Sequence, residues 1–209
     1  MRLPDSVTRQ LARPRGHIGR HLTWRFLNRI NASQYALVLE QLSPDPSDRV
    51  LEVGFGGAAL LRMILDEIPD GSAAGLELSK EMVELADSRL GRYVEAGRLE
   101  LIRGSVDSMP FPGASFDKAA TLNTVYFWPD LAAGLRELAR VVRPGGRLVL
   151  GFASSDDMRA RGLQRSGFQL YSREELSVAV AEAGFRPGTL ASGSTRRGAY
   201  FVLSAERES

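Results

Sequence analysis

Cysteine is absent from this chain of 209 residues, and histidine occurs only twice. The absence of cysteine excludes disulfide bridges, thiolate metal sites and cysteine nucleophiles. With only His17 and His21, a histidine-based metal cluster is not expected, so we predict no metal. Long apolar runs are also missing: no stretch approaches the roughly 18 residues of a membrane-spanning helix, and the start has no hydrophobic signal region. We therefore expect a cytoplasmic protein.

Acidic residues are scarce at the start of the chain. Residues 1–30 contain seven arginines and one acidic residue, Asp5, whereas the whole chain has a formal net charge of +2. The remainder is therefore net acidic. Apolar residues recur at every fourth position from 18 to 30, which predicts an amphipathic helix, and a second helix is expected over about 33–42.

A hydrophobic content of 44% over 209 residues is enough for one core of ordinary size. We divide the chain into a basic helical lid, residues 1–44, and one larger domain, residues 45–209. The lid has three interpretations. It can cover the edge of the domain, it can bind an anionic membrane surface through residues 1–30, or it can bind nucleic acid. Basic charge without aromatic stacking residues predicts no sequence-specific nucleic-acid binding.

The most informative segment is residues 49–58, which read Arg-Val-Leu-Glu-Val-Gly-Phe-Gly-Gly-Ala. An apolar run containing Glu52 turns through Gly54 and Gly56, and a helical pattern begins at Ala58. Glycine permits positive φ and lets a ligand approach the main chain closely. Amides at the helix start then face whatever lies above the strand end. The segment predicts a strand, a turn and a helix that together bind a nucleotide-like cofactor.

Two cofactor classes fit this turn. The dinucleotide fingerprint G-x-G-x-x-G is matched by the two glycines with Ala59 at the sixth position. A carboxylate at Glu52 would repel a pyrophosphate, but it could pair with a cationic amino-acid tail. The pattern resembles motif I of the class I S-adenosylmethionine-dependent methyltransferases, E/D-x-G-x-G-x-G, through Glu52, Gly54 and Gly56, with Ala58 replacing the last glycine. The resemblance implies S-adenosyl-L-methionine as cofactor and S-adenosyl-L-homocysteine as product.

Later segments extend the resemblance over about residues 45–153. Residues 73–79 read as a second strand that ends in Glu77, followed by Leu78 and by Ser79 as a helix N-cap. A carboxylate about 20 residues beyond the glycine turn can accept hydrogen bonds from both ribose hydroxyls. We therefore predict that Glu77 and Leu78 bind the cofactor. The family's GDA-x-x-LPF, FD and RPGG motifs are matched in order by residues 104–111, 115–117 and 143–147.

One position departs from the family pattern. Ser105 stands where the family usually has an acidic residue that accepts from the adenine amino group. A serine hydroxyl can accept the same bond more weakly. We predict that Ser105 and the amide of Val106 contact the adenine, with Asp107 as a solvated or capping residue.

The acceptor side is expected after the fourth strand, because ligands of open α/β sheets bind beyond the carboxyl ends of the strands. Residues 123–128 read Asn-Thr-Val-Tyr-Phe-Trp. Amine-directed members of the superfamily carry Asn/Asp-Pro-Pro-Tyr/Phe here, of which only Asn123 and Tyr126 are present. We predict that Asn123 borders the cofactor, that Tyr126 and Trp128 bind the acceptor, as contacts or as apolar walls, and that Phe127 lies in the core.

Further acceptor contacts are expected from the lid through Trp24, Asn28 and Tyr35. Transfer is an in-line displacement, so holding the nucleophile and the methyl group collinear about 3 Å apart supplies most of the rate. A general base helps only where the nucleophile must lose a proton. Tyr126 and His21 are the catalytic candidates, and their expected contribution is mainly positioning.

The expected fold class is α/β: a Rossmann-like, seven-stranded, mostly parallel sheet with an antiparallel C-terminal hairpin, helices on both faces and the N-terminal helical lid. Ser172 and Glu175 form a capping-box sequence that opens a helix to about residue 183. Residues 189–194 and 198–203 read as the hairpin. The connection over 154–168 is too short for a substrate domain. Its arginines either meet an anionic acceptor or lie in solvent: Arg159, Arg161 and Arg165.

Three functions stay open from the sequence. The first is a methyltransferase that acts on the oxygen or nitrogen of a small-molecule acceptor. The second is a methyltransferase of a lipid headgroup or quinone at a membrane surface, to which the basic lid would bring the enzyme. The third is a non-catalytic protein that binds an adenosyl cofactor. The sequence names neither the acceptor nor the oligomeric state.

Overall fold

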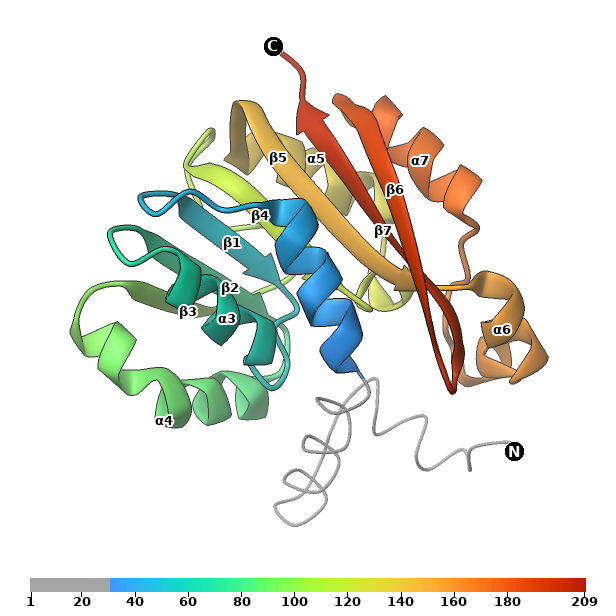
Figure 1. The fold of residues 1–209 in the computed structure, drawn as a ribbon, viewed down its shortest axis with the longest axis horizontal. Helices are drawn as coiled ribbons and strands as arrows, with labels where there is room; N and C mark the ends of the chain where they lie inside the picture. Colours follow the sequence, from blue (N-terminus) through green and yellow to red (C-terminus); the bar gives the residue numbers. More distant parts are fainter. Residues whose placement is uncertain (1–30) are drawn as a thin grey trace.

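The chain is described by a computed structural model, which places residues 31–209 (Figure 1). Residues 31–42 are helical, as predicted for the segment before the first strand. Seven strands follow: β1 Arg49–Val53, β2 Ser72–Glu77, β3 Leu99–Arg103, β4 Phe116–Leu122, β5 Val142–Ala153, β6 Phe185–Thr195 and β7 Gly198–Arg207. The helices between them are α3 Ala59–Glu67, α4 Lys80–Glu95, α5 Leu131–Val141, α6 Ser155–Ala160 and α7 Arg173–Glu182, with 3-10 turns η1 Val125–Phe127 and η2 Leu163–Ser166.

The strands form a single sheet in the order β3-β2-β1-β4-β5-β7-β6. The pairs from β3 through β5 are parallel, whereas β7 runs antiparallel to both β5 and β6. The strand order reverses between β1 and β4, which is the topological switch point where open α/β sheets bind ligands. The predicted seven-stranded sheet with its closing antiparallel hairpin is confirmed.

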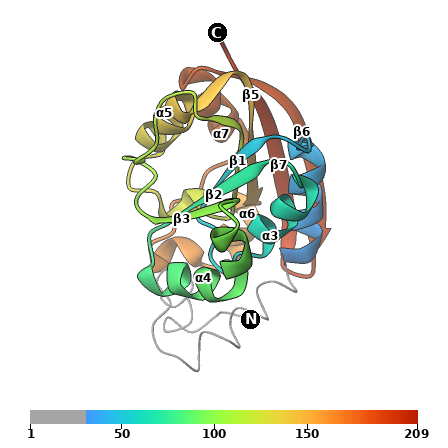
Figure 2. The same ribbon diagram turned by 90° about the vertical axis from the view of Figure 1, so that its left-hand side faces the viewer.

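Helices cover both faces of the sheet, as expected (Figures 1 and 2). Successive residues of β1 face opposite sides, so Leu51 and Val53 pack with α5 and α7, while Val50 packs with α3 and α4. The helix over residues 31–42 joins the second of these cores, because Val38 and Leu42 are fully buried there. At least this part of the predicted lid is therefore packed as an integral layer of the domain.

Helix starts follow the capping residues that the sequence contains. The Ser79 hydroxyl accepts from the Met82 amide at the start of α4. Ser172 and Glu175 form the predicted capping box at the start of α7, with both reciprocal hydrogen bonds present. These caps matter for position, because α4 begins directly after the strand end that carries Glu77.

Strand register brings the carboxyl ends of the central strands to one edge of the sheet. Val53 is opposite both Leu76 on β2 and Thr121 on β4, and Glu77 is opposite Arg103 on β3. The chain segments that leave these ends are consequently neighbours. Within residues 31–209, none of the helices combines the length and the apolar character that crossing a bilayer requires.

Candidate functional site

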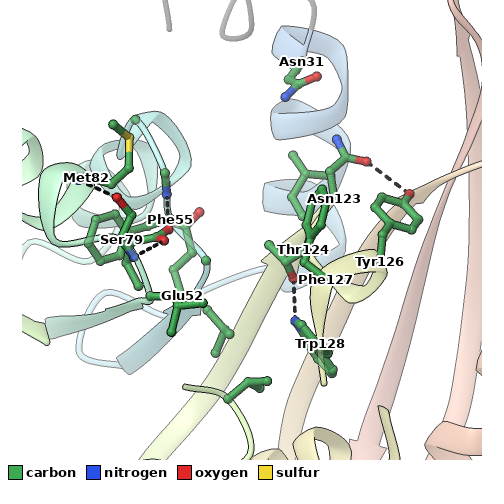
Figure 3. A pocket seen from close by; sticks show the side chains of 18 of the residues that line it. Asn31, Glu52, Phe55, Ser79, Met82, Asn123, Thr124, Tyr126, Phe127 and Trp128 are labelled. Carbon is green, nitrogen blue, oxygen red and sulfur yellow. Dashed lines mark hydrogen bonds between the residues drawn. The ribbon is translucent and has the colours of Figure 1, made fainter. Parts of the chain in front are cut away.

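A cavity of about 800 Å³ lies at the edge where the parallel strands end. Figure 3 shows that its side chains fall into two groups, which face each other across the cavity. We call the first group, from the ends of β1 to β3, the carboxylate end: Glu52, Gly54, Gly56, Glu77, Leu78, Ser105 and Val106. The second group comes from the loop after β4, the α6–η2 segment and the β6–β7 turn. We call it the aromatic end: Asn123, Tyr126, Phe127, Trp128, Arg161, Phe168 and Arg197.

The turn after β1 uses positive φ at alternate residues: Gly54 at 73°, Gly56 at 47° and Ala58 at 59°. A side chain on Gly54 would place its Cβ 2.3 Å from Cγ2 of Thr124, so the first glycine is required by packing against the loop after β4. A Cβ on Gly56 would meet nothing within 4 Å, so this glycine leaves open space above the main chain. Ala58 takes the same left-handed conformation at a cost of about 1–2 kcal/mol.

Glu77 is held by two backbone amides. Its Oε2 accepts from the amide of Gly56 at 3.0 Å, and its Oε1 accepts from the amide of Ser79 at 2.9 Å. The glycine turn and the start of α4 therefore fix the carboxylate from both sides. A carboxylate has about four acceptor positions, so Glu77 keeps capacity for two donors from a ligand in the cavity.

Glu52 is the most unusual group in the cavity. It is 3% exposed, and its Oε2 has no hydrogen-bond partner among residues 31–209. Burial, and then the negative charge of Glu77, raise the pKa of Glu52 to about 8, against a smaller opposing contribution from the amide of Leu61. A buried, unpartnered carboxylate oxygen beside a second carboxylate fits a cationic ligand group. The predicted partner, the cationic amino-acid tail of S-adenosylmethionine, is such a group.

The helix over residues 31–42 reaches the same cavity through Asn31, Gln34 and Tyr35. Burial, and then the charge of Glu52, raise the pKa of Tyr35 to about 12, although a hydrogen bond with Asn31 lowers it. Tyr35 was predicted to bind the acceptor. Its interaction with Glu52 means that it borders the carboxylate end as well.

The predicted adenine contacts line the cavity. Ser105 and Ser108 form an isolated antiparallel bridge, which follows directly from the end of β3. Val106 is 6% exposed, whereas Leu78 is 53% exposed at the mouth. Their roles at the adenine stay predictions.

Asn123 adopts a positive φ of 58° immediately after β4. Its Nδ2 donates to Oε1 of Gln34 at 2.6 Å, and its Oδ1 accepts from the Tyr126 hydroxyl at 3.4 Å. Both ends of the amide are therefore engaged within the protein. Each end keeps one further position, because an amide group has two donors and two acceptor lone pairs, so a role of Asn123 toward a substrate nitrogen stays a prediction.

Tyr126 and Trp128 are buried walls of the aromatic end, at 4% exposure each. The hydroxyl of Tyr126 accepts from the amide of Ala153, and burial raises the pKa of Tyr126 well above its ordinary value. A tyrosine that resists ionisation is poorly suited to act as a general base, so a positioning role fits better. Trp128 donates from Nε1 to Oγ1 of Thr124 at 3.1 Å, and its ring packs against Gly134 of α5.

Phe127 was expected in the core, and that prediction is wrong. The side chain is 37% exposed and lines the cavity, with its ring centroid 4.7 Å from that of Phe168. The three residues of η1 turn successive side chains in different directions, which an apolar sequence run does not reveal. Sequence reasoning also missed Arg197, because a basic residue in a hairpin turn looks like an ordinary solvated position.

Four residues singled out from the sequence lie outside the described residues 31–209. They are the candidate base His21, its neighbour His17, and the proposed acceptor contacts Trp24 and Asn28. The predicted amphipathic helix of residues 17–30 lies outside them as well.

Fold and cavity together define an α/β protein with a nucleoside-type cofactor cleft at its topological switch point. Residues 51–150 match the family model described as a methyltransferase domain. The domain over these residues belongs to the class I S-adenosylmethionine-dependent methyltransferases, which confirms the predicted family and cofactor.

Two curated relatives carry specific names. One is the 27-O-demethylrifamycin SV methyltransferase of Amycolatopsis mediterranei, 29% identical over 170 residues that cover 77% of this chain and 62% of the relative. The other is the ubiquinone/menaquinone biosynthesis C-methyltransferase UbiE of Geotalea daltonii, 30% identical over 131 residues, or 60% of this chain and 56% of the relative. The chain spans 55% to 62% of the length of the first relatives that it matches.

Solved structures support the fold. A complex of the Haloferax volcanii Trm112 methyltransferase activator with a methyltransferase matches with a TM-score of 0.78 at 20% identity, covering 90% of this chain and 93% of that chain. The geranyl diphosphate C-methyltransferase of Streptomyces coelicolor, in complex with S-adenosyl-L-homocysteine, matches with a TM-score of 0.75 at 16% identity, covering 87% and 80%. At these identities the likeness concerns the fold alone.

Proposed function

We propose that this chain transfers a methyl group from S-adenosylmethionine to a small-molecule acceptor, with oxygen as the first candidate nucleophile and carbon as the second. The observation that carries the proposal is that one cavity has both a carboxylate end and an aromatic end. The first end suits a cationic amino acid joined to a nucleoside, and the second suits an organic acceptor. The names of relatives, which include several O-methyltransferases and one C-methyltransferase, support the same choice.

At the carboxylate end, Glu52 would pair with the cofactor's ammonium group and Glu77 would accept from the ribose hydroxyls. The main chain at Gly54 and Gly56 would lie against the amino-acid tail, since Gly56 has no side chain and the space beside it is open. Ser105, the Val106 amide and Leu78 would border the adenine. The cofactor supplies an electrophilic methyl group on a sulfonium centre.

At the aromatic end, the chain's own residues mainly orient the acceptor and exclude water. Tyr126 and Trp128 are fixed by hydrogen bonds to neighbouring groups, so they form rigid walls. Aromatic walls also stabilise positive charge near the methyl donor by cation–π attraction. Nitrogen is the less supported nucleophile, because the relatives named above are O- and C-methyltransferases.

The possible acceptors differ in whether their nucleophilic atom needs a base to remove a proton. Among residues 31–209, the carboxylates that line the cavity are Glu52, Glu77 and Glu81, and all three belong to the cofactor side. The aromatic end thus offers no carboxylate or imidazole from the described part of the chain. An acceptor whose nucleophile ionises readily, such as a phenol or an enol, suits this arrangement. His21 remains the candidate base if a stronger one is needed.

The likeness to a quinone C-methyltransferase favours one second candidate, methylation of a quinone-like acceptor at a membrane surface. This candidate uses residues 1–30 as a basic element that binds anionic lipid. It predicts that the full chain co-sediments with anionic vesicles and that a variant lacking residues 1–30 does not. A cytoplasmic location and a small-molecule partner remain the proposals for the first candidate.

The test begins with calorimetric titration of S-adenosylmethionine and S-adenosylhomocysteine. An acceptor screen follows, split between water-soluble phenols and quinols carried in vesicles, with S-adenosylhomocysteine formation as the readout. Turnover of soluble phenols supports the first function, and turnover of vesicle-borne quinols alone supports the second. Cofactor binding with no turnover in either set would favour a non-catalytic binder.

A further inference from the structure

Two arginines from separate segments line the aromatic end of the cavity. Arg161 follows the last turn of α6, and Arg197 lies in the turn between β6 and β7. Both side chains are half-buried, whereas Arg159, Arg165 and Arg196 in the same two segments are exposed and do not line the cavity. Arg161 and Arg197 therefore differ from the neighbouring arginines in being half-buried and in lining the cavity.

Asp157 fixes the two segments relative to each other. Its Oδ2 accepts from the amide of Ala199 at 2.8 Å, and its carbonyl accepts from the amide of Arg161 at 3.2 Å. The amide of Ser154 also donates to the carbonyl of Ala199 at 2.9 Å, and a Cβ on Gly198 would lie 2.4 Å from Asp157 Oδ2. The close approach of hairpin and helix therefore holds the main chains of Arg161 and Arg197 in place before any ligand binds.

Two guanidinium groups at one end of a partly apolar cavity favour an anionic ligand there. Burial, and then the charge of Arg161, lower the pKa of Arg197, which indicates that the two guanidinium groups repel each other. Within residues 31–209, Arg159 pairs with Asp156, whereas Arg161 forms no ion pair. An anionic ligand group would relieve this repulsion and accept several charge-assisted hydrogen bonds.

We propose that Arg161 and Arg197 form an anion-binding subsite, so that the methyl acceptor carries a carboxylate or phosphate group next to an aromatic or apolar body. The proposal rests on the proposed methyltransferase function and narrows its acceptor. The Phe127 and Phe168 rings on the same side of the cavity would contact the apolar body. Nearby positive charge would also favour an ionised phenolic or enolic nucleophile, at an end of the cavity where residues 31–209 supply no carboxylate or imidazole.

The experiment compares five proteins, each saturated with S-adenosylhomocysteine. They are the wild type, Arg161→Gln, Arg197→Gln and the matched controls Arg165→Gln and Arg196→Gln, which remove equal charge outside the cavity. Each is titrated calorimetrically with 4-hydroxybenzoate, with uncharged 4-hydroxybenzamide and with inorganic phosphate. Comparing carboxylate with phosphate identifies which anion the subsite takes, and thermal unfolding verifies that every variant is folded.

The wild type and both controls should bind one of the anions at least about tenfold more tightly than the amide, because charge-assisted hydrogen bonds are the strong ones. Arg161→Gln and Arg197→Gln should each abolish that preference while S-adenosylhomocysteine affinity stays unchanged. Equal preference in all five proteins, or no preference for either anion in the wild type, overturns the subsite. Failure of the wild type to bind S-adenosylhomocysteine would instead overturn the proposed function.

Discussion

The two ends of the cavity are built in different ways. The carboxylate end comes from the first three strand ends, and its key groups are fixed by the main chain: Glu77 by two amides, and the glycine turn by its positive φ angles. The aromatic end comes from loops and a hairpin turn that lie far apart in the sequence. The first is built mainly from backbone geometry and the second mainly from side chains.

The largest effect is expected from Gly54→Val. The new Cβ would overlap Cγ2 of Thr124, and valine disfavours a φ of 73°. Overpacking of about 1–3 kcal/mol and backbone strain of about 1–2 kcal/mol should add, and cofactor binding should be lost. Thermal unfolding and calorimetry measure both. Gly97→Ala is the control, because Gly97 also has a positive φ, of 69°, its new Cβ would meet nothing within 4 Å, and it does not line the cavity. Cofactor binding by Gly54→Val at the parent's affinity would show that the turn is not part of the site.

Glu77→Ala should weaken S-adenosylmethionine binding by roughly tenfold to a hundredfold, since hydrogen bonds to charged groups contribute about 1.5–3 kcal/mol. The anion preference of the aromatic end should not change. A change in cofactor affinity alone would show that the two ends of the cavity bind their ligands independently. Glu84→Gln is a suitable control because Glu84 is an exposed residue of the adjacent α4, paired with Lys80. If Glu84→Gln and Glu77→Ala bind the cofactor equally well, the ribose assignment fails.

Glu52→Gln should change how stability depends on pH in the absence of cofactor. The folded protein holds the Glu52 proton up to a pKa of about 8, whereas an unfolded glutamate releases it near 4.5. Stability from this group is therefore fully present below about pH 4.5 and is lost as the pH rises through about 8. The glutamine of the variant does not titrate, so the variant does not lose this stability. The unfolding temperature of the variant minus that of the wild type should therefore rise by several degrees between pH 5 and pH 8. A difference that is constant with pH would contradict a buried, protonated Glu52.

Tyr126→Phe should have the smallest effect on turnover. Removing the hydroxyl leaves the amide of Ala153 without its partner, which should cost about 1–3 kcal/mol of stability. With an acceptor from the screen, kcat should fall by less than about tenfold, because a general base typically contributes a factor of about 100 to 10,000. A larger fall, with loss of the basic limb of the pH profile, would make Tyr126 the base after all.

The same division explains what the sequence could predict. Glu52 and the glycines lie in one strand–turn–helix pattern, and Glu77 ends the next strand, so local signals located them. Ser79 and Ser172 were recognisable as caps for the same reason. The aromatic end depends on contacts between distant residues: Asn123 bonds Gln34, 89 positions away, and Asp157 bonds Ala199, 42 positions away.

Such pairings have no local signature. The aperiodic turn around Phe127 and the approach of Arg197 to Arg161 became visible only in the folded chain. The exposure of Phe127 corrects the expectation from its apolar neighbours, because a single 3-10 turn can direct adjacent side chains into the core and into the cavity. The sequence therefore predicted residues that line both ends of the cavity, but it did not predict how side chains from several loops meet at the aromatic end. The binding roles of all these residues stay predictions.

The most direct test of the central claim is a parallel calorimetric titration of the wild type and Glu77→Ala with S-adenosylmethionine, S-adenosylhomocysteine and NAD. The account predicts that the wild type binds the two adenosyl ligands with dissociation constants on the order of micromolar, that it does not bind NAD, and that Glu77→Ala loses most of the adenosyl affinity. Tight NAD binding by the wild type, or equal adenosyl binding by both proteins, would contradict the assignment of the carboxylate end.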